Sequence, residues 1–307
     1  MRKVQDVQAQ VVCVLGMHRS GTSLTARILN SLGVYLGRDE RFSTQPSADN
    51  PKGMWEHPVL SQINIEIFSR LGGSWHDPPL FSPGWEIRTE FQALTQKARD
   101  ILAGEFGHAA LWGWKDPRTC LTLPFWQRLL PNMHYVICMR SPIDVAQSLE
   151  RRDGFPFDKG VKIWLIYMNA ILQHTSGRKR LFVFYDDLIH RWQGELQRLA
   201  HFLGLSELAM RPDVVRDVQA FIEKELQHHR TTILDVIEHD QVAYPAKALY
   251  ALLYFGRYCG DQANSGLAGA DLELDRMVKS FSRKSLEAAV ARRRIARLSR
   301  IMSEWFR

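Results

Sequence analysis

The residues best suited to chemistry form a glycine-containing loop, Gly16-Met17-His18-Arg19-Ser20-Gly21-Thr22-Ser23, between an apolar run and a helix-like segment. Its GxxxxGxS outline is typical of phosphate-binding loops, because small residues let successive backbone N–H groups converge on an anion. The N-terminus of the following helix adds about half a positive charge. Thr22 stands where a nucleoside triphosphatase has its lysine, and Arg19 supplies the cation instead. The loop predicts an anion site, with an ordinary strand-to-helix turn as the alternative.

A second candidate anion site follows another apolar run. Arg140 leaves the run 134–139, and Ser148 comes eight residues later, on a helix expected to begin near Pro142. A guanidinium group offers a planar fork for a phosphate dianion, and a serine hydroxyl adds a neutral donor. By itself an arginine at a strand end is more commonly a solvated charge. Together with the first loop, it predicts two separated phosphate sites that suit a nucleotide phosphorylated at its 5′ and 3′ positions.

These two segments resemble the sulfotransferases that use 3′-phosphoadenosine 5′-phosphosulfate (PAPS). The core Arg19-Ser20-Gly21-Thr22 is similar to the family's 5′-phosphosulfate loop, and Arg140 with Ser148 is similar to its 3′-phosphate site. Tyr185-Asp186-Asp187-Leu188, with the helix after it, also resembles a family segment. The resemblance covers about residues 11–235, and it implies PAPS as co-substrate with no metal.

The resemblance also implies which cations surround the donor. Arg19 is expected nearest the 5′-phosphosulfate, and Lys115 corresponds to a lysine near the sulfate in several sulfotransferases. A surface lysine paired with Asp116 is the alternative for Lys115. Arg230, in the segment His228-His229-Arg230, is implied to lie near the 3′-phosphate.

Glu56 is the residue expected to take the proton from the acceptor. Phenol and steroid sulfotransferases use a histidine two residues after the lysine, where this chain has Pro117. Glycan-type and many bacterial members are thought to use a glutamate after the first helix, and the segment around Glu56 resembles theirs. The apolar face of Trp55 would raise the pKa of Glu56. His57 and Asp116 are the other candidates, and an acidic residue that merely favours a helix start is the structural alternative.

Short apolar runs alternate with helical periodicity along most of the chain. Strands are expected at 11–15, 109–114, 134–139 and 181–185, and helices at 22–32, 58–71, 88–105, 142–151, 158–175 and 188–203. This alternation predicts an α/β fold, with a P-loop-type parallel sheet flanked by helices and a helical C-terminal extension. The expected divisions are an N-terminal tail (1–10), a sulfotransferase domain (11–235) and the extension (236–307).

Length and composition limit the class of protein. A chain of 307 residues that is 45% hydrophobic and 24% charged can bury a core without disulfides, and it is neither collagen-like nor disordered. The four cysteines show no CxxC pair and no metal-ligand spacing. No apolar run approaches the ~20 residues that cross a bilayer, and the first residues lack the apolar region of a signal peptide. A cytoplasmic location is therefore expected.

The net charge of +7 is concentrated at the C-terminus. Residues 276–307 hold ten basic and two acidic residues, a net charge of +8, so the rest of the chain carries −1. This distribution argues against a nucleic-acid-binding protein. Apolar residues recur there at spacings of four and three, namely Ala291, Ile295, Leu298, Met302 and Trp305. They predict a basic amphipathic helix that packs against the body or, alternatively, contacts an anionic membrane, another helix or an acidic polymer.

The expected function is transfer of a sulfuryl group from PAPS to a hydroxyl acceptor by in-line displacement. A carbohydrate acceptor is favoured by the resemblance to glycan-type sites and by five tryptophans that could stack on sugars, Trp55, Trp75, Trp85, Trp112 and Trp114. One alternative is a P-loop kinase for small alcohols, which Thr22 in the lysine position disfavours. Another is a non-catalytic nucleotide-binding or membrane-docking protein that works through its basic tail.

Overall fold

The computed structural model describes residues 9–38, 53, 55–222 and 231–259. The chain divides into two units, Met1–Val242 and Ala243–Arg307. The basic tail and Arg230 lie outside the described residues, as does most of the segment that precedes Glu56. The predicted boundary at residue 235, the cytoplasmic location and the role of the tail stay predictions.

A parallel sheet forms the centre of the first unit. In the described part of the chain it has four strands, β1 (Gln10–Leu15), β2 (Leu111–Lys115), β3 (His134–Met139) and β4 (Arg180–Phe184), in the order β2-β1-β3-β4. All three pairings are parallel, so the carboxyl ends of the strands lie along one edge. Ligands of open α/β sheets bind at this edge. The expected α/β fold with a P-loop-type parallel sheet is confirmed.

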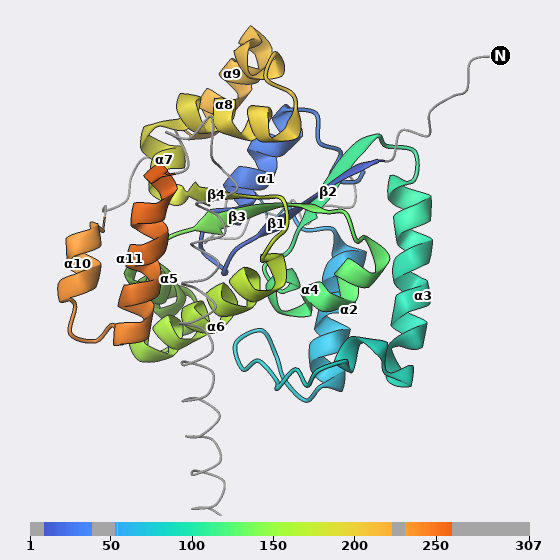
Figure 1. Cartoon of the computed structure of the whole chain (residues 1–307), viewed down its shortest axis with the longest axis horizontal. Helices are drawn as coiled ribbons and strands as arrows, with labels where there is room; N and C mark the ends of the chain where they lie inside the picture. Colours follow the sequence, from blue (N-terminus) through green and yellow to red (C-terminus); the bar gives the residue numbers. More distant parts are fainter. Residues whose placement is uncertain (1–8, 39–52, 54, 223–230, 260–307) are drawn as a thin grey trace, which may run out of the picture. The chain divides into compact units, whose positions relative to one another are not determined.

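Helices cover both faces of this sheet, with α1, α8 and α9 on one side and α2, α4 and α6 on the other (Figure 1). The α-helices of the first unit are α1 (Thr22–Ser31), α2 (Pro58–Arg70), α3 (Gln92–Ile101), α4 (Thr119–Leu129), α5 (Pro142–Asp153), α6 (Phe157–Thr175), α7 (Tyr185–His190), α8 (Trp192–Leu203), α9 (Pro212–Ile222) and α10 (Ile233–Glu238). Short 3-10 turns span Trp85–Ile87, Thr89–Phe91 and Leu208–Met210, and a π-helical turn spans Leu102–Phe106. The second unit contributes α11 (Tyr244–Cys259).

The structure corrects the expected helices in two segments and adds two more helices. The segment 88–105 is divided into a 3-10 turn, α3 and the π-helical turn. The segment 188–203 is interrupted at Arg191, whose φ of −138° is not helical, so that α7 and α8 are separate. Helices α4 and α9 were not expected. Helix α4 contains Pro124, a residue that normally breaks a helix, and this hides its periodicity.

Alternate residues of the strands point into two apolar layers. Val12, Val14 and Val136 pack with apolar residues of α1, α8 and α9 in one layer. The other layer includes Trp114 of β2, whose ring lies 5.5 Å from that of Trp126 on α4. Within the described ranges, none of the helices is long and apolar enough to cross a membrane.

Gly113 of β2 provides a test of how tightly the sheet edge is packed. A Cβ at this position would lie 2.2 Å from the carbonyl oxygen of Val12 in β1. We expect Gly113→Ala to lower the free energy of unfolding by about 1–3 kcal/mol, because the crowded atom belongs to backbone. Urea unfolding measures this change. Gly104→Ala, with nothing within 4 Å of the added Cβ, is the control, and equal destabilisation by both would contradict the prediction.

Candidate active site

The loop between β1 and α1 has a backbone that only particular residues allow. Gly16 and Gly21 have positive φ angles of 150° and 85°, and Arg19 also has a positive φ of 70°. A Cβ on Gly21 would lie 2.5 Å from the ring of Tyr185. The left-handed conformation of Arg19 is uncommon for a residue other than glycine, and such strain is concentrated at functional sites.

The start of α1 presents an uncompensated positive end. Its first turn has no acidic residue, and the first N–H groups of a helix lack intrahelical partners. The side-chain oxygen of Ser20 is buried and has no hydrogen-bond partner among the described residues. The backbone N–H of Ser20 donates to the carbonyl oxygen of Met17 at 3.1 Å, which closes the turn. The loop can therefore accept an anion.

The second predicted anchor contacts the first directly. The Nε atom of Arg19 donates a hydrogen bond of 2.8 Å to the hydroxyl oxygen of Ser148 on α5. Arg140 follows β3 and donates from Nη1 to the carbonyl oxygen of Arg19 at 3.2 Å. The expected picture of two separated sites is therefore incomplete, because the left-handed turn at Arg19 directs its long side chain across to α5.

Arg140 is held on several sides and keeps one donor available. Its guanidinium carbon lies 4.3 Å from the ring centroid of Tyr185. Its Nε lies 3.7 Å from a carboxylate oxygen of Asp144, which is longer than a hydrogen bond. This buried Nε has no hydrogen-bond partner within the described ranges. Asp144 also accepts a hydrogen bond from Thr231. A fixed arginine with an unused donor suits an anionic ligand.

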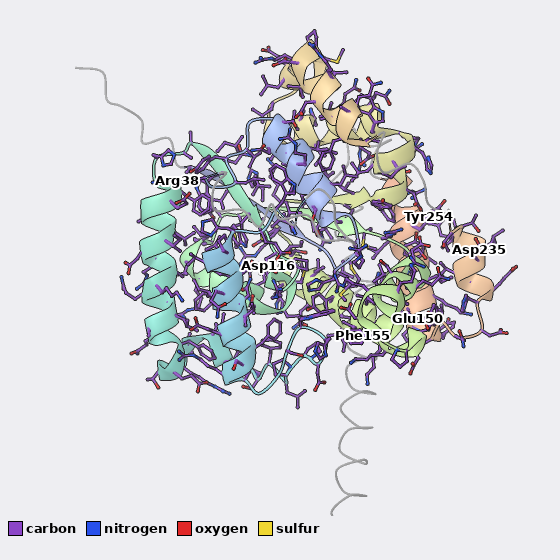
Figure 2. All side chains as sticks on the ribbon, turned by 180° about the vertical axis from the view of Figure 1, so that it is seen from behind. Arg38, Asp116, Glu150, Phe155, Asp235 and Tyr254 are labelled. Carbon is purple, nitrogen blue, oxygen red and sulfur yellow. The ribbon has the colours of Figure 1, made fainter. Side chains whose placement is uncertain are left out.

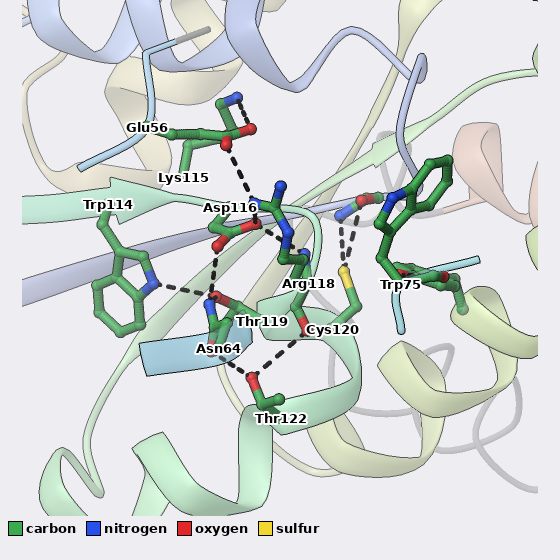
Figure 3. Close-up of polar contacts among 12 residues, drawn as sticks. Glu56, Asn64, Trp75, Trp114, Lys115, Asp116, Arg118, Thr119, Cys120 and Thr122 are labelled. Atoms are coloured by element: carbon green, nitrogen blue, oxygen red, sulfur yellow. Dashed lines mark hydrogen bonds and ion pairs between the residues drawn. The ribbon is translucent and has the colours of Figure 1, made fainter. Parts of the chain in front are cut away.

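A cluster of ion pairs lies at the end of β2 (Figure 3). Lys115 Nζ is 2.8 Å from Oε1 of Glu56, and Nη1 of Arg118 is 3.2 Å from Oε2 of the same carboxylate. Arg118 also lies 3.0 Å from Asp116 Oδ1. Lys115 is only 2% exposed. The alternative of a surface lysine paired with Asp116 is therefore wrong, since Lys115 is buried and pairs with Glu56.

The two carboxyl groups of this cluster have opposite pKa shifts. Burial alone would raise the pKa of Glu56, but Lys115 and Arg118 together lower it below its ordinary value. Burial raises the pKa of Asp116; Arg118 acts to lower this pKa, and the negative charge of Glu56 acts to raise it. The expectation that Trp55 raises the pKa of Glu56 is wrong. The Trp55 ring instead faces Arg27, whose guanidinium carbon is 5.2 Å from the ring centroid.

Buried polar side chains hold Asp116 in place. Asn64 of α2 donates from Nδ2 to Asp116 at 2.9 Å and to the Thr119 hydroxyl at 3.0 Å. The side-chain oxygen Oδ1 of Asn64 accepts hydrogen bonds from the Thr122 hydroxyl at 2.6 Å and from the Trp126 indole N–H at 2.8 Å. Figure 2 shows Asp116 surrounded by other side chains, in agreement with an exposure of 1%. Asp116 therefore orients Arg118 from the interior.

The remaining predicted residues are divided between the site and the core. His57 is buried, precedes α2 and packs against the ring of Phe106 at 5.5 Å. Three tryptophans cannot stack on a sugar because they are buried in the core, namely Trp85, Trp112 and Trp114. Trp55 and Trp75 keep partial exposure. In the described residues no group of three His, Cys, Asp or Glu side chains is placed to hold a metal ion.

Sequence reasoning did not identify Arg118 or the surroundings of His18. Arg118 directly precedes α4, three residues after Lys115. This short spacing from Lys115 is the sequence feature that could have identified it. The His18 ring lies 4.3 Å from Trp75 and 6.1 Å from Tyr167. No local pattern connects these three positions, because a loop and α6 bring them together only in the fold.

The parallel sheet, the glycine loop before α1 and the contact between Arg140 and Arg19 define a P-loop-type α/β protein with cationic side chains at one edge of its sheet. A family model described as "Sulfotransferase family" matches residues 11–209. This match spans more than half of the chain, and the chain therefore belongs to the sulfotransferase family, whose enzymes transfer sulfuryl groups.

Several solved structures are similar at low identity. A sulfotransferase from Mycobacterium tuberculosis is 12% identical, with 72% of this chain and 77% of that chain covered and a TM-score of 0.44. The sulfotransferase domain of an olefin synthase from Synechococcus is 17% identical, with 89% and 96% covered and a TM-score of 0.46. Retinol dehydratase in complex with androsterone and the inactive cofactor PAP is 15% identical, with 90% and 80% covered and a TM-score of 0.35. No curated protein sequence matches the chain.

Proposed function

We propose that this protein transfers a sulfuryl group from PAPS to a hydroxyl group of an acceptor, with a carbohydrate as the expected acceptor class. The observation that carries the proposal is the junction of the two anchors, in which Arg140 and Ser148 each hydrogen-bond to Arg19. A nucleotide with phosphate groups at both its 5′ and 3′ positions would engage both anchors. ATP would leave the second anchor without a ligand.

The residues present fit such a donor. The buried Nε of Arg140 and the buried hydroxyl of Ser20 both lack hydrogen-bond partners among the described residues, and an anion would supply acceptors for them. We assign the 5′-phosphosulfate to the loop backbone from His18 to Ser23 and to the side chain of Arg19. Arg140 and Ser148 would hold the 3′-phosphate, and the family resemblance adds Arg230.

Glu56, Lys115 and Arg19 are the residues that we propose for the chemistry. Bound PAPS supplies a sulfuryl group, whose sulfur bonds to the acceptor oxygen as its bond to the 5′-phosphate oxygen breaks. Glu56, which Lys115 and Arg118 hold in its ionised form by lowering its pKa, takes the proton of the acceptor hydroxyl. Lys115 and Arg19 stabilise the negative charge that develops. Lys115 holds Glu56 in place through their 2.8 Å contact.

Thermal unfolding with two nucleotides tests the assignment. A ligand present at 100 times its Kd stabilises the folded state by about 2.7 kcal/mol. We therefore expect adenosine 3′,5′-bisphosphate to raise Tm by several degrees, and ATP with Mg²⁺ to have little effect. A larger shift with ATP and Mg²⁺ would contradict the proposal and favour a kinase. No shift with either nucleotide would favour a protein that does not use this edge.

A further inference from the structure

His18 lies in the loop between β1 and α1, and its side chain packs against two aromatic rings. The imidazole ring is 4.3 Å from Trp75 and 6.1 Å from Tyr167 of α6, by ring centroids. The residue is 8% exposed, and its buried Nε2 has no hydrogen-bond partner among the described residues. A buried polar group without a partner is costly, and such a group in a native structure needs an explanation.

The charged groups that act on His18 are all cations, contributed by the loop, the end of β2, the residue before α4 and the end of α5. They are Arg19, Lys115, Arg118 and Arg152. Lysine and arginine side chains have hydrogen-bond donors and no acceptors, so none of them can accept the N–H of the imidazole. Two of these cations, Lys115 and Arg118, are themselves paired with the carboxylates of Glu56 and Asp116.

Among the described residues, the aromatic neighbours of His18 do not hydrogen-bond to its Nε2 atom either. Trp75 and Tyr167 present their rings, and the Tyr167 hydroxyl donates to the carbonyl oxygen of Trp75 at 2.9 Å. His76 lies beyond Trp75, with ring centroids 5.3 Å apart. A ligand that carries both negative charge and lone pairs would satisfy the imidazole and compensate the cations around it.

We propose that His18 is a further anion-binding residue of the donor site, whose imidazole donates a hydrogen bond to the 5′ group of the nucleotide and takes up a proton when that group binds. The inference rests on the proposed function. It adds a second cationic side chain of the loop, so that Arg19 and His18 would both contact the 5′ group.

The direction of the proton uptake follows from the surroundings. Burial, followed by the four cations, lowers the pKa of His18 well below its ordinary value, so the free protein holds a neutral imidazole near pH 7. An anion at the loop offsets the cations and favours imidazolium, which raises the pKa in the complex. The bound state then holds more protons than the free state. Affinity for the nucleotide should therefore increase as the pH falls from the bound pKa towards the free pKa.

NMR titration of the histidine side chains in the full-length protein tests this inference with two probes. Adenosine 3′,5′-bisphosphate carries the 5′ group, and adenosine 3′-phosphate lacks it. We expect the bisphosphate to raise the pKa of His18 and the monophosphate to leave it unchanged. Bound bisphosphate with a His18 that stays neutral at pH 6 would overturn the inference, as would an equal rise with both nucleotides.

A matched pair of variants adds a binding readout. Charge-assisted hydrogen bonds are strong, so His18→Asn should lower the affinity for the bisphosphate about ten-fold at pH 6. The loss of affinity should be smaller at pH 8. His174→Asn is the control, because burial lowers the pKa of His174 to about 4, yet it lies at the far end of α6. Equal affinity of His18→Asn and wild type at both pH values would overturn the inference. If the wild type itself fails to bind the bisphosphate, the proposed function fails instead.

Discussion

Replacing Glu56 with glutamine is expected to lower kcat for sulfuryl transfer by about 100- to 10,000-fold, the usual contribution of a general base. Glutamine keeps the size of the side chain but cannot take the acceptor proton. The Lys115–Glu56 ion pair of 2.8 Å would become a hydrogen bond from the ammonium group to an uncharged amide oxygen, so the lysine would be less well held. The rate is measured as release of adenosine 3′,5′-bisphosphate from PAPS, with the acceptor that gives turnover in a panel of sugars and phenols.

Glu66→Gln is the matched control for this change. Glu66 lies on α2, and its carboxylate pairs with Lys97 at 3.1 Å near the surface. Exposed ion pairs of this kind contribute little, so kcat should stay near the wild-type value. Binding of the bisphosphate should be retained in both variants. A Glu56→Gln enzyme with unchanged kcat would exclude Glu56 as the base and direct attention to His57 and Asp116.

Replacing Arg140 with alanine is expected to lower the affinity for adenosine 3′,5′-bisphosphate by about 100-fold, because a charge-assisted contact to the 3′-phosphate is lost. The change also removes the donor to the carbonyl oxygen of Arg19, which loosens the loop. Affinity for adenosine 5′-phosphate, which has no 3′-phosphate, should fall much less. Isothermal titration calorimetry with the two nucleotides measures the difference.

Arg178→Ala is the control for loss of an arginine. Arg178 donates to the carbonyl oxygen of Pro131 at 2.7 Å on the exposed surface, away from the carboxyl ends of the strands. Its removal should leave both affinities unchanged. If Arg140→Ala lowered the affinity for both nucleotides equally, Arg140 would act on the loop as a whole, and its assignment to the 3′-phosphate would be wrong.

The sheet and the two anchors could be predicted because their signals are local. β-Branched and other apolar residues form β1 and β3, each followed at once by the residues that carry charge or glycine. Parallel strands bring such residues to one edge whatever the details of packing. For this reason Gly16, Lys115 and Arg140 were correctly placed at strand ends.

The contacts across the site could not be predicted from local patterns. Asn64 is an ordinary polar residue within an apolar helix, and only the approach of α4 shows that it hydrogen-bonds to Asp116. The pKa of Glu56 depends on Lys115 and Arg118, which are distant in sequence. Trp55 was a reasonable but wrong choice of neighbour, because sequence adjacency does not determine which side chains face each other.

The first turn of α4 restricts how this protein could be redesigned. The thiol of Cys120 accepts a hydrogen bond from the N–H of Gly16 at 3.2 Å, while Arg118, two residues earlier, pairs with Glu56. One short stretch therefore adjoins both the donor loop and the proposed base. An engineer seeking a new acceptor preference should therefore leave residues 116–120 intact.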